Sequence, residues 1–384
     1  MAILRRHRKT RAGMPIAILS AAVMSTITQA QTPASNARPA TSSLDPPRAF
    51  EIVQPADVAA LRERLADRND DISLAGDVLT IMHRDARDSV VVSGSLQTPM
   101  SRIPGSDIWY VHLKRNGWDR AFFSYLFAAR LPSSLESEPM REYRGSRAPV
   151  LTRARSLTGR IVVRQISSKH LNADRSVSIY LPPDARAPLP VLFMADGAFM
   201  DRFARVLEPL ILAGRIEPIA IVGTHASVEP ATRPGLDRRA QEYVPVVAPP
   251  IFAQHLQFLI EEVVPAVTRE FQLSTRPEDR ALFGFSSGAA FAVAAVARHP
   301  GTFSHALAFS LNLPRVETAK QLAPTYYFAA GELEPYFLKT TRGVHEQLSN
   351  AGTRSTFRSY LSGHNLMLWQ LALSEYLPEI FPPR

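Results

Sequence analysis

The sequence contains no cysteine in its 384 residues. This absence excludes structural disulfides, a thiol nucleophile and a lipid anchor attached to cysteine. Long hydrophobic runs are also lacking, because no segment after residue 30 approaches the ~18 continuous apolar residues that a membrane-spanning helix needs. Neither thiol chemistry nor a bundle of transmembrane helices is therefore expected.

Acidic residues are missing from the first 44 positions. The first acidic residue in the sequence is Asp45. Subtracting the five basic residues of this stretch up to position 11 reduces the formal net charge from +9 to +4. A remaining charge of +4 does not indicate nucleic acid as a partner, although a local arginine cluster can still favour an anionic ligand. The five basic residues are Arg5, Arg6, Arg8, Lys9 and Arg11.

The N-terminus has the pattern of a targeting segment. The basic stretch is followed by an apolar run over residues 12–24 and by the small-residue sequence Thr28-Gln29-Ala30. This order is typical of a secretory signal peptide, which we expect over residues 1–30, with an N-terminal membrane anchor as the alternative. Residues 31–50 are rich in proline, serine and threonine and predict a linker. We therefore expect a periplasmic or secreted protein.

Residues 51–150 are expected to form a small all-β sandwich domain. Apolar residues alternate with polar ones in short segments, and stretches rich in glycine, proline, asparagine and aspartate separate them. The expected strands are Val78–His83, Ser89–Ser93, Trp109–Leu113 and Ala121–Ala128.

Residues 155–384 change to an alternation of apolar strands and amphipathic helices. Because most of these strands are apolar throughout, they predict a mostly parallel sheet that is covered by helices on both faces. The fold class expected for this second domain is therefore α/β. Its expected strands include Val191–Ala195, Ile219–Gly223, Ala281–Phe285, Tyr326–Ala330 and Phe357–Leu361.

One motif points directly to chemistry. The segment Gly284-Phe285-Ser286-Ser287-Gly288 fits G-x-S-x-G and lies between an expected strand and an expected helix. In this context the central serine, Ser286, stands on a sharp turn as a nucleophile, and the amide of the next residue can hold an oxyanion. An ordinary serine at a helix N-terminus and Ser287 as the nucleophile are the alternatives.

A serine nucleophile needs a histidine base and an acid that orients the base. His364 is the expected base, because it follows the strand 357–361 at the carboxyl edge of the sheet, and His299, His305 and His345 are interpreted as structural. The acid should follow the strand 326–330, where Glu334 is preferred and Glu332 remains open.

The second oxyanion donor should come from the loop after the strand 191–195. This loop reads Asp196-Gly197-Ala198-Phe199, and the amide of Ala198 is the candidate donor, with a simple type I turn as the alternative. Asp196 precedes the serine in the chain and is interpreted as a turn residue, not as the catalytic acid.

Together these segments resemble the esterase D-type α/β-hydrolases, and specifically the enterochelin (enterobactin) esterase family. The resemblance covers nearly the whole chain after the leader, and its motifs are more specific in combination than singly. They include 177–182, Asp196-Gly197, 239–243, 261–265, the G-x-S-x-G run, Gly331-x-x-Glu334 and Gly363-His364-Asn365 with Trp369. Residues 100–110 resemble the immunoglobulin-like leading domain of that family.

The resemblance implies hydrolysis of serine ester bonds in a catecholate trilactone that usually carries ferric iron. Carried over by position, Ser286 is the nucleophile, His364 the base and Glu334 the acid. Ala289, Asn365 and the segment 309–313 depart from the family pattern and bear on the substrate more than on the ester chemistry. Arg239 and Trp369 are candidate substrate contacts, although Arg239 could instead pair with Glu242.

Alternatives to this function remain open at the level of sequence. A feruloyl, acetyl-xylan or peptide-lactone esterase would use the same three residues, and so would an acyltransferase. A non-catalytic periplasmic binding protein is the alternative from another class. The expected partner is a small-molecule ester. No metal or other cofactor is expected, because no metal-ligand motif occurs. The oligomeric state is left open.

Overall fold

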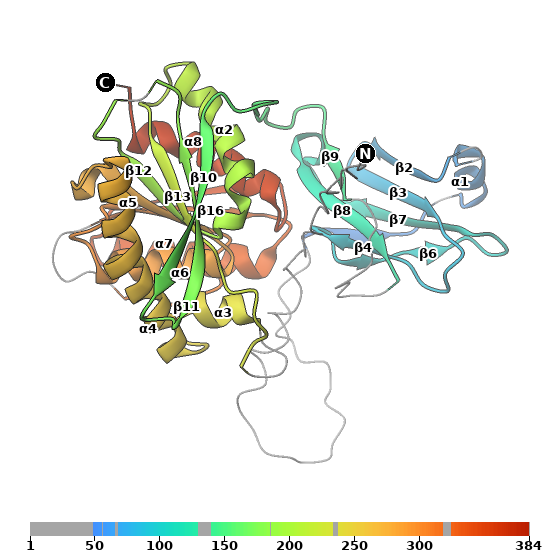
Figure 1. The fold of residues 1–384 in the computed structure, drawn as a ribbon. Coiled ribbons are helices and arrows are strands. Elements are labelled where there is room, and N and C mark those ends of the chain that lie inside the picture. The colour runs from blue at the N-terminus through green and yellow to red at the C-terminus, as the bar shows by residue number, and fades with distance from the viewer. Residues whose placement is uncertain are drawn as a thin grey trace, which may run out of the picture.

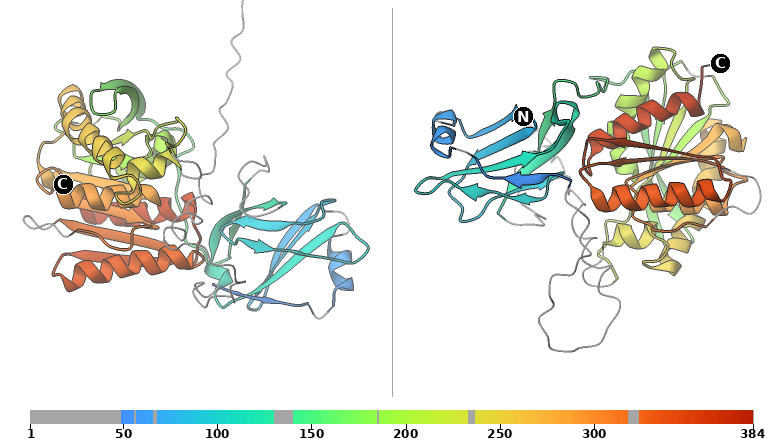
Figure 2. Two further views of the ribbon diagram at one scale, coloured as in Figure 1. Left: turned by 90° about the horizontal axis from the view of Figure 1, so that it is seen from below. Right: turned by 180° about the vertical axis from the view of Figure 1, so that it is seen from behind.

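The computed structural model describes residues 49–383, apart from residues 56, 66–67, 130–139, 185, 233–236 and 318–323. The chain forms a β domain followed by a larger α/β domain beside it (Figure 1). Further views show that the two domains meet along one side of the α/β domain (Figure 2). The expected signal peptide and most of the expected linker lie outside the described residues.

The N-terminal domain consists of two antiparallel sheets, which confirms the expected all-β sandwich. Aliphatic and aromatic side chains from both sheets, among them Leu79, Val92 and Phe123, fill the space between them. The first sheet has the order β1-β7-β3-β2, with β6 paired to β7, and the second has the order β5-β4-β8-β9. Their bounds are β1 Glu51–Val53, β2 Asp70–Ala75, β3 Val78–Arg84, β4 Val91–Gly94, β5 Thr98–Pro99, β6 Ser101–Arg102, β7 Ile108–Lys114, β8 Phe122–Ala128 and β9 Arg141–Arg144.

Two strands of this domain have no clear alternation in the sequence. β2 begins with two aspartates, and β9 reads Arg-Glu-Tyr-Arg in a stretch rich in charged residues. Pairing with β3 and β8 gives these segments their extended form. The domain also contains the short helix α1, Ala59–Arg64, and a 3₁₀ turn, Trp118–Arg120.

The α/β domain is built on an eight-stranded sheet of order β10-β11-β13-β12-β14-β15-β16-β17. The first two strands pair antiparallel, β11 pairs antiparallel with β13, and the remaining neighbours are parallel. This is the mostly parallel sheet that the apolar strands predicted. The bounds are β10 Arg160–Ser168, β11 Ala173–Leu181, β12 Val191–Ala195, β13 Ala220–Thr224, β14 Arg280–Phe285, β15 His305–Phe309, β16 Thr325–Gly331 and β17 Ser355–Tyr360.

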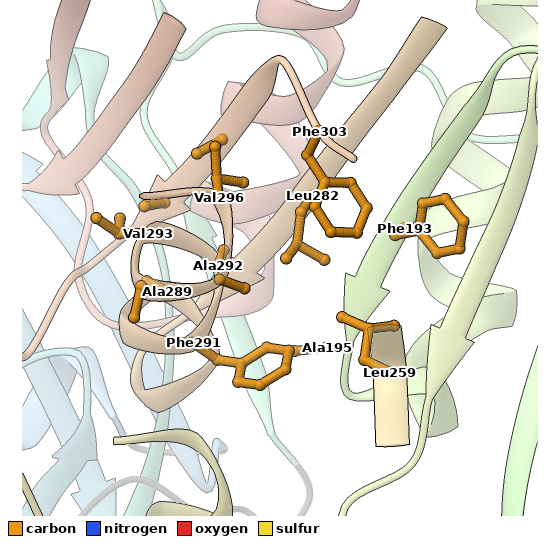
Figure 3. Packing of buried hydrophobic residues seen from close by; sticks show 14 of the residues in the cluster. Phe193, Ala195, Leu259, Leu282, Ala289, Phe291, Ala292, Val293, Val296 and Phe303 are labelled. Atoms are coloured by element: carbon orange, nitrogen blue, oxygen red, sulfur yellow. The ribbon is translucent and has the colours of Figure 1, made fainter. Parts of the chain in front are cut away.

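Helices cover both faces of the sheet. One face packs against α2, Met200–Leu212, and α8, Leu366–Ile380. The other packs against α4 to α7, and α6 brings alanines and valines against Leu282 and Phe193 of the sheet (Figure 3). Small side chains on α6 let this helix lie close to the strands that carry it. The bounds are α3 Arg238–Tyr243, α4 Pro249–Gln257, α5 Val264–Phe271, α6 Ser287–Arg298 and α7 Pro335–Asn350.

The pattern over residues 252–271 predicts one long helix, and the structure contains an α-helix, a π-helical segment and a second α-helix in succession. The π segment is Phe258–Val263, between α4 and α5. Pro265 lies in the first turn of α5 and has no amide hydrogen for the carbonyl one turn before it. The hydrogen-bond pattern therefore changes next to the proline.

Across the described part of the chain, no helix combines the length and the apolar character that crossing a bilayer requires. The structure therefore identifies no membrane-spanning helix in these residues.

A buried glutamate fixes the segment that connects the two domains. The carboxylate of Glu208 on α2 accepts hydrogen bonds from the amides of Thr158 and Gly159, each at 2.7 Å, and from the Tyr180 hydroxyl at 2.8 Å. Burial alone would raise the pKa of Glu208, but these donors outweigh it and hold the pKa below its ordinary value of 4.5. The charged form of Glu208 thus stabilises the folded state.

We expect Glu208→Gln to lower the free energy of unfolding at pH 7 by about 2 kcal/mol, because hydrogen bonds to a charged acceptor are lost. A lowered pKa gives stabilisation that is present above pH 4.5 and disappears as the pH falls through the folded-state value. Urea unfolding should therefore show a difference in the free energy of unfolding between wild type and Glu208→Gln that is smaller at pH 3 than at pH 7. Asp201→Asn on the same helix, at an exposed ion pair, is the control. An equal difference at both pH values would contradict this role.

Candidate active site

Ser286 stands on a strained turn between β14 and α6. Its backbone has φ 55° and ψ −125°, an unfavourable conformation for a residue with a side chain. Its amide donates to the carbonyl of Phe309 at 2.9 Å, which holds the turn against the end of the neighbouring strand. A Cβ atom at Gly284 would lie 1.9 Å from the carbonyl oxygen of Gly288, so the turn can close only around a glycine. This is the geometry that the G-x-S-x-G motif predicts.

The order of the strands brings the candidate residues to one edge of the sheet. β14, β15, β16 and β17 are parallel neighbours, so their carboxyl ends lie side by side. Ser286, Ser310, Glu334 and His364 follow these four strands in that order. Residues separated by 78 positions in the chain are thus collected at one edge by the topology.

The base and the acid are in direct contact. Nδ1 of His364 lies 2.6 Å from Oε2 of Glu334, both side chains being largely buried. The other carboxylate oxygen accepts from the Gly331 amide and from the Ser310 hydroxyl, each at 2.6 Å. A carboxylate beside Nδ1 favours the tautomer with its proton on that nitrogen, which leaves Nε2 to accept a proton.

Trp369 packs against the imidazole of the candidate base, His364. Its indole Nε1 donates to Ser310 Oγ at 2.8 Å, and its ring meets the His364 imidazole edge-on with centroids 4.9 Å apart. The indole also stacks on Phe285 with centroids 4.2 Å apart, while Phe337 stacks on the His364 imidazole with centroids 4.1 Å apart. With 5% of its surface exposed, Trp369 is better placed to position His364 than to contact a substrate.

The structure separates the two glutamates between which the sequence left a choice. Glu334 is bound to His364, whereas the carboxylate of Glu332 bonds to the guanidinium of Arg115 in the N-terminal domain. Glu332 is also more exposed than Glu334. The geometry therefore favours Glu334 as the acid.

Arg239 is buried next to the turn that carries Ser286 and is not exposed at the surface. Its guanidinium donates twice to the carboxylate of Asp196, at 2.6 Å each, and once to the Phe285 carbonyl at 3.1 Å. Burial alone would lower the pKa of Arg239, but the charge of Asp196 outweighs this and raises it. The guanidinium is charged and neutralised by Asp196. This arrangement favours a supporting role over contact with an anionic substrate.

The alternative partner of Arg239, Glu242, is engaged elsewhere. Glu242 is completely buried, accepts from Arg175 at 2.6 Å and lies 3.6 Å from Arg238. The alternative pair of Arg239 with Glu242 is therefore wrong, because Glu242 pairs with Arg175 and, on its own helix, with Arg238.

The two candidate oxyanion donors both lie in the first turn of a helix. Ser287 is the first residue of α6, where an amide has no acceptor within the helix. Ala198 is the middle residue of the 3₁₀ turn Gly197–Phe199, whose first hydrogen-bonded amide is that of Phe199. A Cβ atom at Gly197 would lie 2.1 Å from the Gly223 carbonyl oxygen, so glycine lets this turn pack against β13.

The other histidines downstream of Ser286 lie away from this edge. His299 ends α6, and His305 opens β15 at its amino end. His345 lies in α7 and contacts the Ser355 hydroxyl at 2.8 Å. Burial lowers the pKa of all three, as suits neutral structural histidines.

Two residues of the site were not found from the sequence. Ser310 has φ 51° at the end of β15 and joins Glu334 to Trp369. Its only signal is a polar residue at the end of an apolar strand, in a segment that departs from the family pattern. Arg115 lies 217 positions from Glu332 in another domain, and nothing in its local sequence indicates this partner.

Comparison with known proteins supports an ester hydrolase. Residues 168–325 match the family model Esterase, described as "Putative esterase". The matched segment includes Ser286 and ends before Glu334 and His364. No curated protein matches the chain significantly in sequence.

Solved structures of esterases share the fold. Enterochelin esterase from Shigella flexneri is 17% identical with a TM-score of 0.63, over 86% of this chain and 99% of that one. Ferric enterobactin esterase from Salmonella typhimurium is 16% identical with a TM-score of 0.64, over 83% and 98%. A ferulic acid esterase from Anaeromyces mucronatus in complex with ferulic acid is 16% identical with a TM-score of 0.51, over 61% and 96%.

The chain shares with these esterases an α/β-hydrolase fold that is preceded by a β domain. The enterochelin esterase structures align over nearly their full length. The aligned part of this chain is larger than its α/β domain alone, so it includes residues of the β domain. The resemblance to enterochelin esterases that the sequence predicted is thus confirmed at the level of architecture.

Exchange of each glutamate for glutamine should distinguish their roles. We expect Glu334→Gln to lower kcat by about 10²–10⁴-fold, because the amide cannot hold and stabilise a protonated imidazole. Glu332→Gln should cost less than about fivefold, since its carboxylate is turned to Arg115. Turnover of p-nitrophenyl acetate measures both, with thermal unfolding as the check on folding. The opposite ranking would assign the acid to Glu332.

Proposed function

We propose that the protein is a serine esterase that hydrolyses the ester bonds of a catecholate siderophore trilactone through an acyl-enzyme. The single observation that carries the proposal is the contact of His364 with Glu334 at the sheet edge where Ser286 stands. The two-domain architecture that the chain shares with enterobactin esterases supports the substrate class.

The site geometry supports an acyl-enzyme mechanism. His364 Nε2 accepts the proton of the Ser286 hydroxyl while Oγ attacks the ester carbonyl carbon, and the amides of Ala198 and Ser287 hold the resulting oxyanion. Collapse of this intermediate breaks the ester bond, and the leaving serine oxygen of the siderophore takes the proton from His364 and becomes a hydroxyl. A water molecule, deprotonated by His364, then attacks the acyl-enzyme and releases the carboxylic acid product and free Ser286.

A solved structure of the Shigella flexneri esterase was obtained in the presence of enterobactin, and another in the presence of 2,3-dihydroxy-N-benzoyl-serine. In this chain Arg239 is already neutralised by Asp196. Recognition of an anionic ferric catecholate therefore has to come from other groups. The expected signal peptide supports a location of this activity in the periplasm or outside the cell.

The nucleophile is tested by covalent labelling. A fluorophosphonate should modify wild-type protein at Ser286, and Ser286→Ala should lose both labelling and nearly all turnover while it remains folded. Ser287→Ala is the matched control, because its backbone amide is retained, and it should still be labelled. Turnover that persists in Ser286→Ala would discard the mechanism.

The substrate is tested by mass spectrometry of the products formed from the iron-bound and iron-free catecholate trilactone. Each hydrolysed ester adds one water, so linear trimer, dimer and monomer of catechoyl-serine are expected, and none of them with Ser286→Ala. No cleavage by protein that the fluorophosphonate still labels would retain the esterase and reject the siderophore.

A feruloyl esterase is the second candidate, and the likeness to a ferulic acid esterase structure supports it. Ferulate and catecholate esters both present a hydroxylated aromatic ring. In ferulate a carbon–carbon double bond joins this ring to the ester carbonyl, whereas in the trilactone the ring is attached through the amide of each serine. Methyl ferulate, assayed beside the trilactone, distinguishes the two. Faster cleavage of methyl ferulate would favour the carbohydrate esterase.

A further inference from the structure

The β domain contacts the α/β domain at the two loops that carry the acid and the base. Leu333 and Leu361 are buried in the hydrophobic core of the β domain, together with Trp118 and Phe123. The Phe122 amide donates to the Leu361 carbonyl at 3.1 Å. The loops after β16 and β17 are thus packed against the other domain.

A polar contact joins the β domain to the residue after His364. Asn365 Nδ2 donates to Ser95 Oγ at 3.0 Å and to the Gly363 carbonyl at 3.0 Å, while its Oδ1 accepts from the Leu368 amide at 3.0 Å and begins α8. Ser95 follows β4, and its amide donates to the Ser124 carbonyl at 3.1 Å. Asn365 therefore links a fixed position of the sandwich to the first turn of α8.

Gly363, the residue before His364, packs directly on the same serine. A Cβ atom at Gly363 would lie 2.4 Å from Ser95 Cβ, 2.7 Å from its Oγ and 2.9 Å from its Cα. The φ of Gly363 is outside the left-handed region. Glycine is thus required here for space, and the space is occupied by Ser95.

From these contacts we propose that Ser95 is a positioning residue for the base, and that the β domain thereby forms part of the catalytic machinery. The proposal rests on the serine-esterase function above, in which His364 is the base. Ser95 contacts the residues on both sides of His364, so it fixes the short loop from which the imidazole projects. A displacement of about 1 Å at such a position can cost about 10²-fold in rate.

The acid loop is held from the same domain. Arg115 follows β7, and its guanidinium bonds to Glu332, two residues before Glu334. The acid and the base are therefore each flanked by a residue that the β domain holds. The relative position of the two catalytic groups depends on a domain that supplies neither of them.

The experiment is an exchange of size across the domain contact. In full-length protein, Gly363→Ala should lower kcat for p-nitrophenyl acetate by about 10²-fold, because the added methyl group displaces the loop. Ser95→Gly makes room, so the double variant should recover at least about tenfold of this loss. Ser95→Ala alone should lower kcat by about fivefold, the effect of one net hydrogen bond, with KM nearly unchanged. The rate of fluorophosphonate labelling at Ser286 should follow kcat.

Ser106→Ala is the matched control, because the Ser106 hydroxyl bonds to Ile103 within the β domain. It should leave kcat and the labelling rate unchanged. A purely structural role of Ser95 would lower the unfolding temperature and leave both rates intact in folded protein, which would overturn the proposal. A double variant as slow as Gly363→Ala would overturn it too.

If Gly363→Ala does not fold, Ser95→Ala decides the question, and unchanged kcat in that variant rejects the positioning role. Wild-type protein that hydrolyses the ester without labelling at Ser286 would instead reject the serine esterase itself. The experiment therefore distinguishes failure of the positioning role of Ser95 from failure of the serine-esterase function.

Discussion

The carboxylate of Glu334 is the point on which the active-site geometry depends. One oxygen holds His364 Nδ1, and the other accepts from Ser310 and from the Gly331 amide. A buried carboxylate is stable only with such partners, and each of them comes from a different strand end. Ser310 also binds Trp369, which packs against the imidazole of His364. The charge of Glu334 therefore aligns the base and, through Ser310, the indole that supports it.

The sheet provides the rigid frame that this arrangement needs. Apolar side chains fill both faces of β14 to β16, and small residues of α6 allow the helix to approach the strands closely (Figure 3). The unfavourable backbone of Ser286 persists because Gly284 lets the turn pack closely on Gly288 and because the Phe309 carbonyl binds the Ser286 amide. The core thus supports local strain at the position where a nucleophile must project.

Much of this architecture could be predicted from the sequence, because the strands are apolar and the helices periodic. Strand 191–195 has the expected bounds, and the expected strand–turn–helix context located Ser286. Long-range pairing could not be predicted. The partner of Arg239 is Asp196, 43 positions away, and not its helix neighbour Glu242. The strand Arg141–Arg144 is extended because β8 lies beside it, which local composition does not reveal.

The contact between Gly363 and Ser95 bears on how such enzymes can be recombined. The ferulic acid esterase structure aligns with 61% of this chain, close to the share of the α/β domain, whereas the enterochelin esterase aligns with 86%. In this chain the sandwich is not an interchangeable module. A chimera with a foreign leading domain would need a small residue opposite Gly363, a cation opposite Glu332 and an apolar surface for Leu333 and Leu361. The two domains are therefore constrained to diverge together.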